Sequence, residues 1–117
     1  MCGIFGLVGS ITEVDAKACV NTLSHRGPDG WGLWAEEGIT LGHRRLSILD
    51  LSENGKQPMS DASGRYHITF NGEIYNFLEI RRELEALGHR SRTDSDTEVI
   101  LAAFFQWGEA CQSRFNG

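Results

Sequence analysis

Cys2 is the residue whose position in the sequence most directly suggests chemistry. The chain begins MCGIFGLVG, so removal of the initiator methionine would leave Cys2 with both a thiol and a free α-amine. A thiolate is a strong nucleophile, and an α-amine with a pKa of about 8 can accept the thiol proton near neutral pH. Cys2 is therefore a candidate N-terminal nucleophile. The alternative interpretation is a strand cysteine without a chemical role.

The cysteine and histidine spacings give no support to a metal site. Cys2, Cys19 and Cys111 are too far apart in the sequence to form a zinc motif with each other or with the four histidines. An odd, widely spaced set of cysteines indicates a reducing compartment better than a disulfide scaffold. Because the sequence also lacks a signal-peptide pattern and an apolar run of about 20 residues, we expect a cytoplasmic protein without a membrane span.

Length and charge exclude further classes of function. The 117 residues correspond to about one small domain, and 16 acidic residues outnumber 11 basic ones. A net charge of −5 argues against a non-specific nucleic-acid surface. We therefore expect neither nucleic acid nor a membrane as a partner.

The first half of the sequence predicts a strand, a helix and a strand pair that would position Cys2. Residues 2–9 are typical of a buried strand, and Thr12 with Asp15 predicts a helix start. That helix should bury Val14, Ala18 and Leu23 and end near the sequence HRGPDG. Residues 31–49 then predict two strands that turn at the sequence EEG.

The second half predicts one more strand and two helices. Residues 65–70 alternate as in a half-buried strand, and Asn76 could cap a helix that runs to Gly88. Ser95 with Glu98 predicts a further helix, whose residues 99–107 are apolar on almost every face. Because such a helix needs to be covered, we expect the chain to be part of a longer protein or to pack against a partner.

Six ordered sequence blocks identify a family. The blocks are MCGIFGLVG, SHRGPDGWG, GHRRLSILDLS, QPMS, FNGEIYNF and SDTEVILAA. Together they resemble the glutaminase domain of asparagine synthetases, a class II glutamine amidotransferase with an N-terminal nucleophile. The resemblance implies an α+β fold, an αββα sandwich of antiparallel sheets. Residues 1–117 would then be part of a type 2 glutamine amidotransferase domain, truncated before its last strands and before an ATP-dependent synthetase domain.

The resemblance implies catalytic roles for three residues. Cys2 matches the nucleophile that attacks the side-chain amide of glutamine. The Asn71 side chain and the Gly72 N–H match the donors to the oxyanion that this attack creates. Without the family pattern, an Asn-Gly pair is typical of an ordinary turn.

The resemblance also implies a set of substrate-binding residues. Arg45 matches the arginine that binds the α-carboxylate of glutamine, and the backbone near Leu46 and Ile48 would form the same pocket wall. Asp96 matches the carboxylate that binds the α-ammonium, with help from Glu73. The alternative for Asp96 is an acid favoured at a helix N-terminus.

Two further residues, Arg44 and His25, are expected to lie outside this site. Adjacent strand residues point to opposite faces, so Arg44 should be a surface charge if Arg45 lines the pocket. His25 could form a dyad with Cys2, but its sequence context predicts a turn, and the α-amine already supplies a base.

The implied activity is hydrolysis of L-glutamine to L-glutamate and ammonia through a Cys2 thioester. The ammonia would serve ATP-dependent asparagine synthesis from aspartate. The glutaminase domain should need no cofactor, and ATP and Mg²⁺ would bind in the synthetase domain, its partner in the parent chain. Two alternatives stay open: a non-catalytic assembly module or truncated fragment, and a related amidotransferase with a different acceptor acid. Homo-oligomerisation also stays open.

Overall fold

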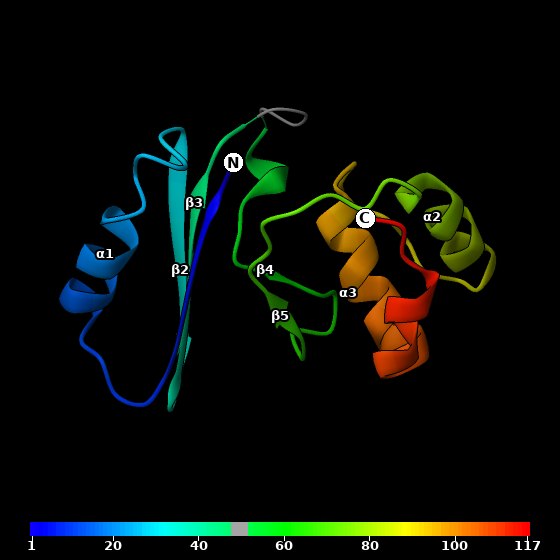
Figure 1. The fold of residues 1–117 in the computed structure, drawn as a ribbon. Coiled ribbons are helices and arrows are strands. Elements are labelled where there is room, and N and C mark those ends of the chain that lie inside the picture. The colour runs from blue at the N-terminus through cyan, green and yellow to red at the C-terminus, as the bar shows by residue number, and fades with distance from the viewer. Residues whose placement is uncertain (48–51) are drawn as a thin grey trace. The chain divides into compact units, whose positions relative to one another are not determined.

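The computed structural model describes residues 1–47 and 52–117, which form two units (Figure 1). The first unit comprises residues 1–59 and 68–71, and the second comprises residues 60–67 and 72–117. Together they contain both α-helices and antiparallel β-structure, as an α+β chain requires. Among the described residues, no helix is both long and apolar enough to cross a membrane.

A three-stranded antiparallel sheet forms the centre of the first unit. Its strands are β1 (Gly3–Val8), β3 (Ile39–Arg45) and β2 (Gly30–Glu36), in the order β1-β3-β2. The predicted turn between the strands of residues 31–49 is confirmed, and Gly38 adopts the positive φ of 80° that it needs. Register pairs Gly3 with Arg44 and Gly30 with Arg45.

Helix α1 (Glu13–Asn21) covers one face of this sheet (Figure 1). The Thr12 hydroxyl accepts a hydrogen bond from the Asp15 N–H at 3.1 Å, which confirms the predicted helix start. Val20 is fully buried over Gly42, where a Cβ atom would collide with its Cγ2 methyl group. The absence of a side chain at residue 42 therefore lets the helix pack closely on the central strand.

The buried face of α1 differs from the predicted one. Ala16 and Val20 are buried, whereas Val14 is 78% exposed and Ala18 is also exposed. Residues 16 and 20 are one turn apart and share a face, while residues 14 and 18 point away from the sheet. The prediction of the helix was right, and the prediction of its buried face was wrong at Val14 and Ala18, whereas Leu23, which follows the helix, is half-buried.

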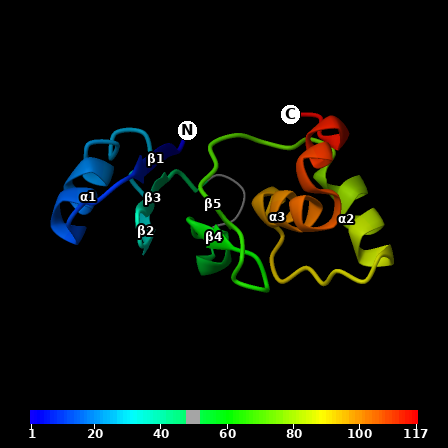
Figure 2. The ribbon, with the colours of Figure 1, turned by 90° about the horizontal axis from the view of Figure 1, so that it is seen from below.

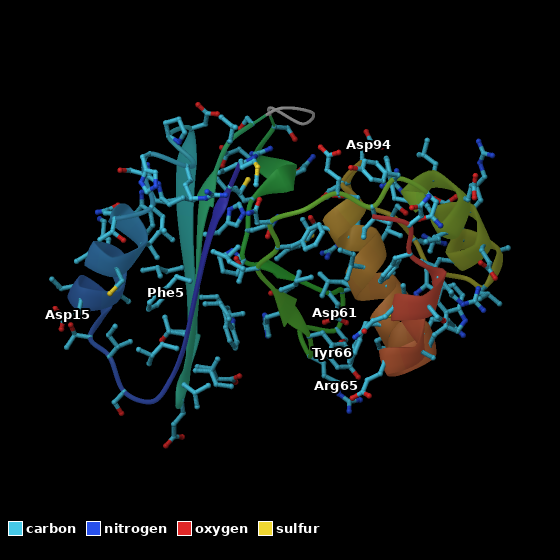
Figure 3. All side chains as sticks on the ribbon, viewed as in Figure 1. Phe5, Asp15, Asp61, Arg65, Tyr66 and Asp94 are labelled. Atoms are coloured by element: carbon cyan, nitrogen blue, oxygen red, sulfur yellow. The ribbon has the colours of Figure 1, made fainter. Side chains whose placement is uncertain are left out.

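The apolar sequence of β1 predicted a buried strand, but one face of β1 is exposed. Phe5 lies on the side of the sheet that faces α1 (Figure 3), but Ile4 is 50% exposed and Val8 is 89% exposed. The strand therefore alternates between a covered and an open face.

The connector after β3 contains a short 3₁₀ helix, η1 (Glu53–Gly55), so Asn54 and Gly55 do not form a hairpin turn. Strands β4 (Met59–Ser60) and β5 (His67–Ile68) form a two-stranded sheet, shorter than the strand predicted over residues 65–70. The turn before β5 is closed by Asp61, which accepts hydrogen bonds from the backbone of Ser63 and Tyr66.

In the second unit, α2 (Phe77–Ala86) and α3 (Asp96–Trp107) lie side by side (Figure 2). The 3₁₀ helix η2 (Gly108–Arg114) follows α3. The apolar core of this unit comprises Ile74, Ile80, Leu84, Val99, Leu101, Ala103 and Cys111. Residues 99–107 are therefore buried in part, while Phe105 stays 52% exposed.

The two helix starts predicted in this unit have different outcomes. The Ser95 hydroxyl accepts from the Thr97 N–H at 3.1 Å and caps α3 as predicted. Glu98 does not complete a capping box, because its carboxylate accepts from the backbone N–H groups of Arg92 and Thr93, each at 2.8 Å. Asn76 precedes α2 but makes no side-chain capping bond.

Candidate active site

Cys2 lies at the end of the sheet, against the residue that follows β3. The Leu46 N–H donates to Cys2 Sγ at 3.4 Å, and Sγ lies 3.9 Å from the Leu46 carbonyl oxygen. Because β1 pairs Gly3 with Arg44, continuing the register by one residue sets Cys2 opposite Arg45. Cys2 and Arg45 therefore share the face of the sheet opposite α1.

The three cysteines differ in their surroundings. Cys2 is half-buried next to an exposed Met1, and Cys19 is half-buried on α1. Cys111 is 2% exposed, and burial raises the pKa of its thiol, which disfavours the thiolate that a nucleophile needs. Of the three, Cys2 is the one with a backbone N–H aimed at its sulfur and a cationic side chain on the same sheet face.

Arg26 is a functional candidate that its position in the sequence did not indicate. Its Nε donates to the Cys2 carbonyl oxygen at 3.1 Å. The same loop contains Asp29, whose N–H donates to the Arg45 carbonyl and whose Oδ2 accepts from the Ser47 N–H at 2.8 Å. The loop thus holds both Cys2 and the chain around Leu46. Arg26 belongs to the block SHRGPDGWG, which is one of the blocks that resemble the family. The neighbouring residues of that block do not indicate that Arg26 contacts residue 2.

Arg44 and Arg45 point to opposite faces, as predicted. Arg45 Nη1 donates to the Ser52 carbonyl oxygen at 2.7 Å, on the Cys2 side. Arg44 Nε donates to the Gly27 carbonyl oxygen at 2.8 Å, on the α1 side. The prediction of Arg44 as a surface charge was wrong, because this side chain is half-buried and fixes the loop after α1.

Three hydrogen bonds fix the segment that leads to Asn71 within the first unit. The Thr69 hydroxyl donates to the Gly42 carbonyl at 3.0 Å, and the Phe70 N–H donates to Gln57 Oε1 at 2.5 Å. His43 Nε2 lies 3.3 Å from the Phe70 carbonyl oxygen. Asn71 follows this segment directly. Strand β3 therefore helps to position Asn71, the predicted oxyanion donor, and it also carries Arg45.

His43 is the most deeply buried polar residue of this face, at 1% exposure. A carbonyl oxygen can only accept, so Nε2 carries the proton in the neutral ring, and Nδ1 is buried without a hydrogen-bond partner in the part of the chain that the structure describes. Burial lowers the pKa of His43; the hydrogen bond to Phe70 opposes this, and the positive charge of Arg45 adds to it. The neutral form of His43 is therefore favoured more than that of an ordinary histidine.

The second unit contains Gly72, Glu73 and Asp96. Asp96 is the first residue of α3, and its Oδ2 accepts from the Ile74 N–H at 2.9 Å. Gly72 and Glu73 are exposed. The division between the units falls between Asn71 and Gly72, so the predicted site residues belong to both.

Two further sequence predictions concern residues near this region. Ile48 lies outside the described residues. His25 is exposed, and its Nδ1 lies 3.1 Å from the Thr22 carbonyl oxygen, so the turn interpretation is confirmed.

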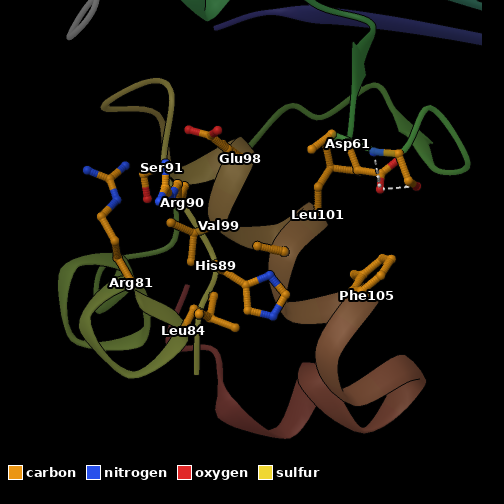
Figure 4. A pocket seen from close by; sticks show the side chains of 14 residues that line it. Asp61, Arg81, Leu84, His89, Arg90, Ser91, Glu98, Val99, Leu101 and Phe105 are labelled. Carbon is orange, nitrogen blue, oxygen red and sulfur yellow. Dashed lines mark hydrogen bonds between the residues drawn. The ribbon is translucent and has the colours of Figure 1, made fainter. Parts of the chain in front are cut away.

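The second unit also contains a cavity of about 440 Å³ between α2, α3 and the turn at residues 61–63 (Figure 4). Leu84, Val99 and Leu101 give it an apolar lining, and Glu98 is one of its charged lining residues. Burial alone would raise the pKa of Asp61, but hydrogen bonds from Ser63, Tyr66 and Arg65 lower it below its ordinary value. The residues that line this cavity include none of the predicted site residues.

Comparison with known proteins finds similarity over the whole chain. The sequence profile of the family described as glutamine amidotransferase domain matches residues 1–117. The chain is 43% identical over 124 residues to asparagine synthetase (glutamine-hydrolyzing) 1 of Bacillus subtilis (strain 168), a match that covers 100% of the chain and 20% of that protein.

Two further relatives show the same pattern. Asparagine synthetase (glutamine-hydrolyzing) 3 of Bacillus subtilis (strain 168) is 41% identical over 124 residues, covering 100% of the chain and 20% of that protein. Asparagine synthetase (glutamine-hydrolyzing) 3 of Arabidopsis thaliana is 37% identical over 122 residues, covering 100% of the chain and 21% of that protein. The chain spans about a fifth of the length of these relatives.

Proposed function

Because this chain belongs to the glutamine amidotransferase domain family, we propose that it hydrolyses L-glutamine to L-glutamate and ammonia, with Cys2 as the nucleophile. The observation that carries this proposal is the position of Cys2 Sγ, 3.4 Å from the Leu46 N–H and on the same sheet face as Arg45. The thiol that we propose as the nucleophile, a backbone N–H and the cation that we propose for the substrate carboxylate thus lie at one end of one sheet.

The reaction requires that Met1 be removed, so that Cys2 carries a free α-amine. The amine takes the thiol proton, and Sγ attacks the side-chain amide carbon of glutamine while the carbonyl electrons move to oxygen. Asn71 Nδ2 and the Gly72 N–H would stabilise this oxyanion, and a single such donor contributes about 3–4 kcal/mol in comparable sites.

Two products leave in sequence. When the tetrahedral intermediate collapses, the C–N bond breaks, the α-ammonium of Cys2 returns its proton to the leaving nitrogen, and ammonia departs. A γ-glutamyl thioester stays on Cys2. Water, deprotonated by the same amine, then attacks the thioester carbon, and glutamate and the free thiol are formed.

Charge complementarity supports the proposed substrate orientation. The Arg45 guanidinium would pair with the α-carboxylate of glutamine, and the Asp96 and Glu73 carboxylates with its α-ammonium. The backbone near Leu46 would form a wall of the same pocket. An amino acid bound in this way would be recognised by both of its charged groups.

We also propose the context of this activity. The chain would supply part of an αββα sandwich in a longer cytoplasmic protein, in which a synthetase domain binds ATP and Mg²⁺ and uses the ammonia to convert aspartate to asparagine. The names of the relatives and their greater length support this proposal. The glutaminase step itself would need no cofactor.

The test is to measure ammonia release from glutamine by the full protein that contains this chain. Cys2→Ala should abolish it, and Cys19→Ala, which removes a half-buried thiol of the same unit, should leave it unchanged. Intact mass should show the loss of Met1 in the active protein. Glutamine hydrolysis that persists in Cys2→Ala would refute the assignment of the nucleophile.

A further inference from the structure

Asn76 uses its side chain to bind a distant segment rather than the helix that it precedes. Its Nδ2 donates to the Arg114 carbonyl oxygen at 2.9 Å, and its Oδ1 accepts from the Asn116 N–H at 2.9 Å. Both polar atoms of the amide are thus engaged, and neither caps α2. An amide that bridges two backbone groups 38 and 40 residues away fixes the distance between two parts of the chain.

The residues next to Asn76 contact the same segment. The Tyr75 N–H donates to the Asn116 carbonyl oxygen at 2.7 Å. Gly117 lies so close to Glu73 that a Cβ atom on it would collide with the Glu73 carbonyl oxygen and come within 3.1 Å of the Glu73 carbonyl carbon. Residues 114–117 therefore lie along residues 73–76, and the fit needs a residue without a side chain at position 117.

Helix α3 also binds the loop that residues 72–76 form. Asp96 Oδ2 accepts from the Ile74 N–H, so consecutive backbone groups at Ile74 and Tyr75 are fixed by different elements. The segment 114–117 is anchored in turn, because Arg114 Nη1 donates to Glu83 Oε1 at 2.8 Å and its guanidinium stacks 3.8 Å from the ring centre of Trp107. The loop thus rests on α2 and α3 through several independent contacts.

We propose that Asn76 is a positioning residue, which holds Gly72 and Glu73 in place for glutamine by clamping the loop 72–76 to residues 114–117. This inference rests on the proposed function, in which Gly72 donates to the oxyanion and Glu73 binds the substrate ammonium. Asn76 itself touches no substrate. Its contribution is to fix the backbone of residues 73–76, and displacement by about 1 Å at such a site can cost roughly 100-fold in rate.

A merely structural role for Asn76 predicts a different outcome. Loss of hydrogen bonds would then lower the stability of the second unit and leave the chemistry of folded molecules unchanged. Ile80→Val is the matched control for this effect, because it removes one methyl group from the core of the second unit and leaves the hydrogen-bonding groups of the loop in place. Arg82→Ala, on the exposed side of α2, controls for substitution on this helix as such.

The experiment compares two reagents for Cys2 in the full protein that contains this chain. The diazoketone 6-diazo-5-oxo-L-norleucine has the shape of glutamine and depends on the substrate site, whereas iodoacetamide reports the thiol alone. Asn76→Ala should lower kcat/KM for glutamine hydrolysis by about 10- to 100-fold and slow diazoketone labelling to a similar degree. The rate of iodoacetamide labelling should not change.

Two further variants keep the inference testable if Asn76→Ala does not fold. Asn76→Asp keeps the acceptor for the Asn116 N–H but loses the donor to Arg114, so its loss of diazoketone labelling should be smaller. Gly117→Ala should reproduce the effect from the other side of the clamp. Ile80→Val should lower the melting temperature and leave the ratio of the two labelling rates at the wild-type value.

Different results would overturn the proposed function and the role of Asn76. A wild-type protein that neither hydrolyses glutamine nor reacts with the diazoketone at Cys2 would overturn the proposed function. A wild-type protein that does both, with an unchanged ratio of labelling rates in Asn76→Ala or in the two further variants, would overturn the role of Asn76 alone.

Discussion

Acidification should destabilise the first unit through His43. The ring is 1% exposed, its Nε2 proton points to the Phe70 carbonyl oxygen, and no described residue offers an acceptor to its buried Nδ1 if that nitrogen takes up a second proton. Burial lowers the pKa of His43, and the nearby Arg45 adds to this against the opposing effect of the Phe70 hydrogen bond. The unfolded chain therefore binds a proton at residue 43 more readily than the folded chain does.

The sign and the upper limit of the effect follow from this difference. The unfolded-state pKa of histidine is about 6.5, so the stability that neutral His43 provides is complete above that pH and is lost as the pH falls toward the lower folded-state pKa. For one group whose folded-state pKa lies well below the range, the free energy of unfolding falls by about 1.4 kcal/mol between about pH 7.5 and 5.5. His43 can therefore lower the free energy of unfolding by no more than about 1.4 kcal/mol over this range of pH.

Urea unfolding followed by tryptophan fluorescence measures this effect. Trp31 and Trp34 lie in β2, and a Trp107→Phe background removes the tryptophan of the second unit. His43→Gln keeps a donor near the Phe70 carbonyl but cannot titrate, so it should flatten the pH dependence. His25→Gln, at an exposed position of the same unit, is the control for replacing a histidine by glutamine. Equal losses of stability in the wild type and in His43→Gln would refute the reasoning.

Two other substitutions probe contacts of the first unit. Arg26→Ala removes a charged donor from the Cys2 carbonyl, worth about 1.5–3 kcal/mol, so ammonia release from glutamine should slow by about 10- to 100-fold, and Arg26→Lys should restore only part of the rate. Gly42→Ala places a Cβ atom against Val20 and should cost about 1–3 kcal/mol in urea unfolding, with partial recovery when Val20→Ala is added; an unchanged midpoint would contradict the packing argument.

Local signals in the sequence predicted local features of the fold. The caps at Thr12 and Ser95 were predictable because each hydroxyl bonds a backbone N–H only two or three residues away. The turn between β2 and β3 was predictable because Gly38 adopts the positive φ that disfavours other residues. In each case the determining interaction lies within a few residues of the chain.

Features that depend on distant partners could not be predicted in this way. Val14 looked like a core residue because it is apolar, but whether α1 buries residue 14 or residue 16 depends on how the helix meets the sheet. Asn76 has the residue type of a helix cap, and its amide instead bonds residues 114 and 116. No pattern in the sequence indicates that the Asn76 side chain binds residues 114 and 116 and not the first turn of α2.

The candidate site shows the same division. The family resemblance indicated Cys2, Arg45 and Asn71 as residues, but not what holds them. Arg26 and His43 supply those contacts in the first unit, through the Cys2 and Phe70 carbonyl groups. Both bonds join residues at least 24 positions apart, so they appear only when the strands have paired.

Strand β3 explains why packing and chemistry in the first unit depend on each other. Gly42 and Arg44 face α1, where they admit Val20 and bind the Gly27 carbonyl, while His43 and Arg45 face the opposite side. Because side chains alternate along a strand, a shift of register by one residue would exchange these two sets. The close packing of α1 over Gly42 selects one register, and that register is the one that turns Arg45 toward the side of Cys2.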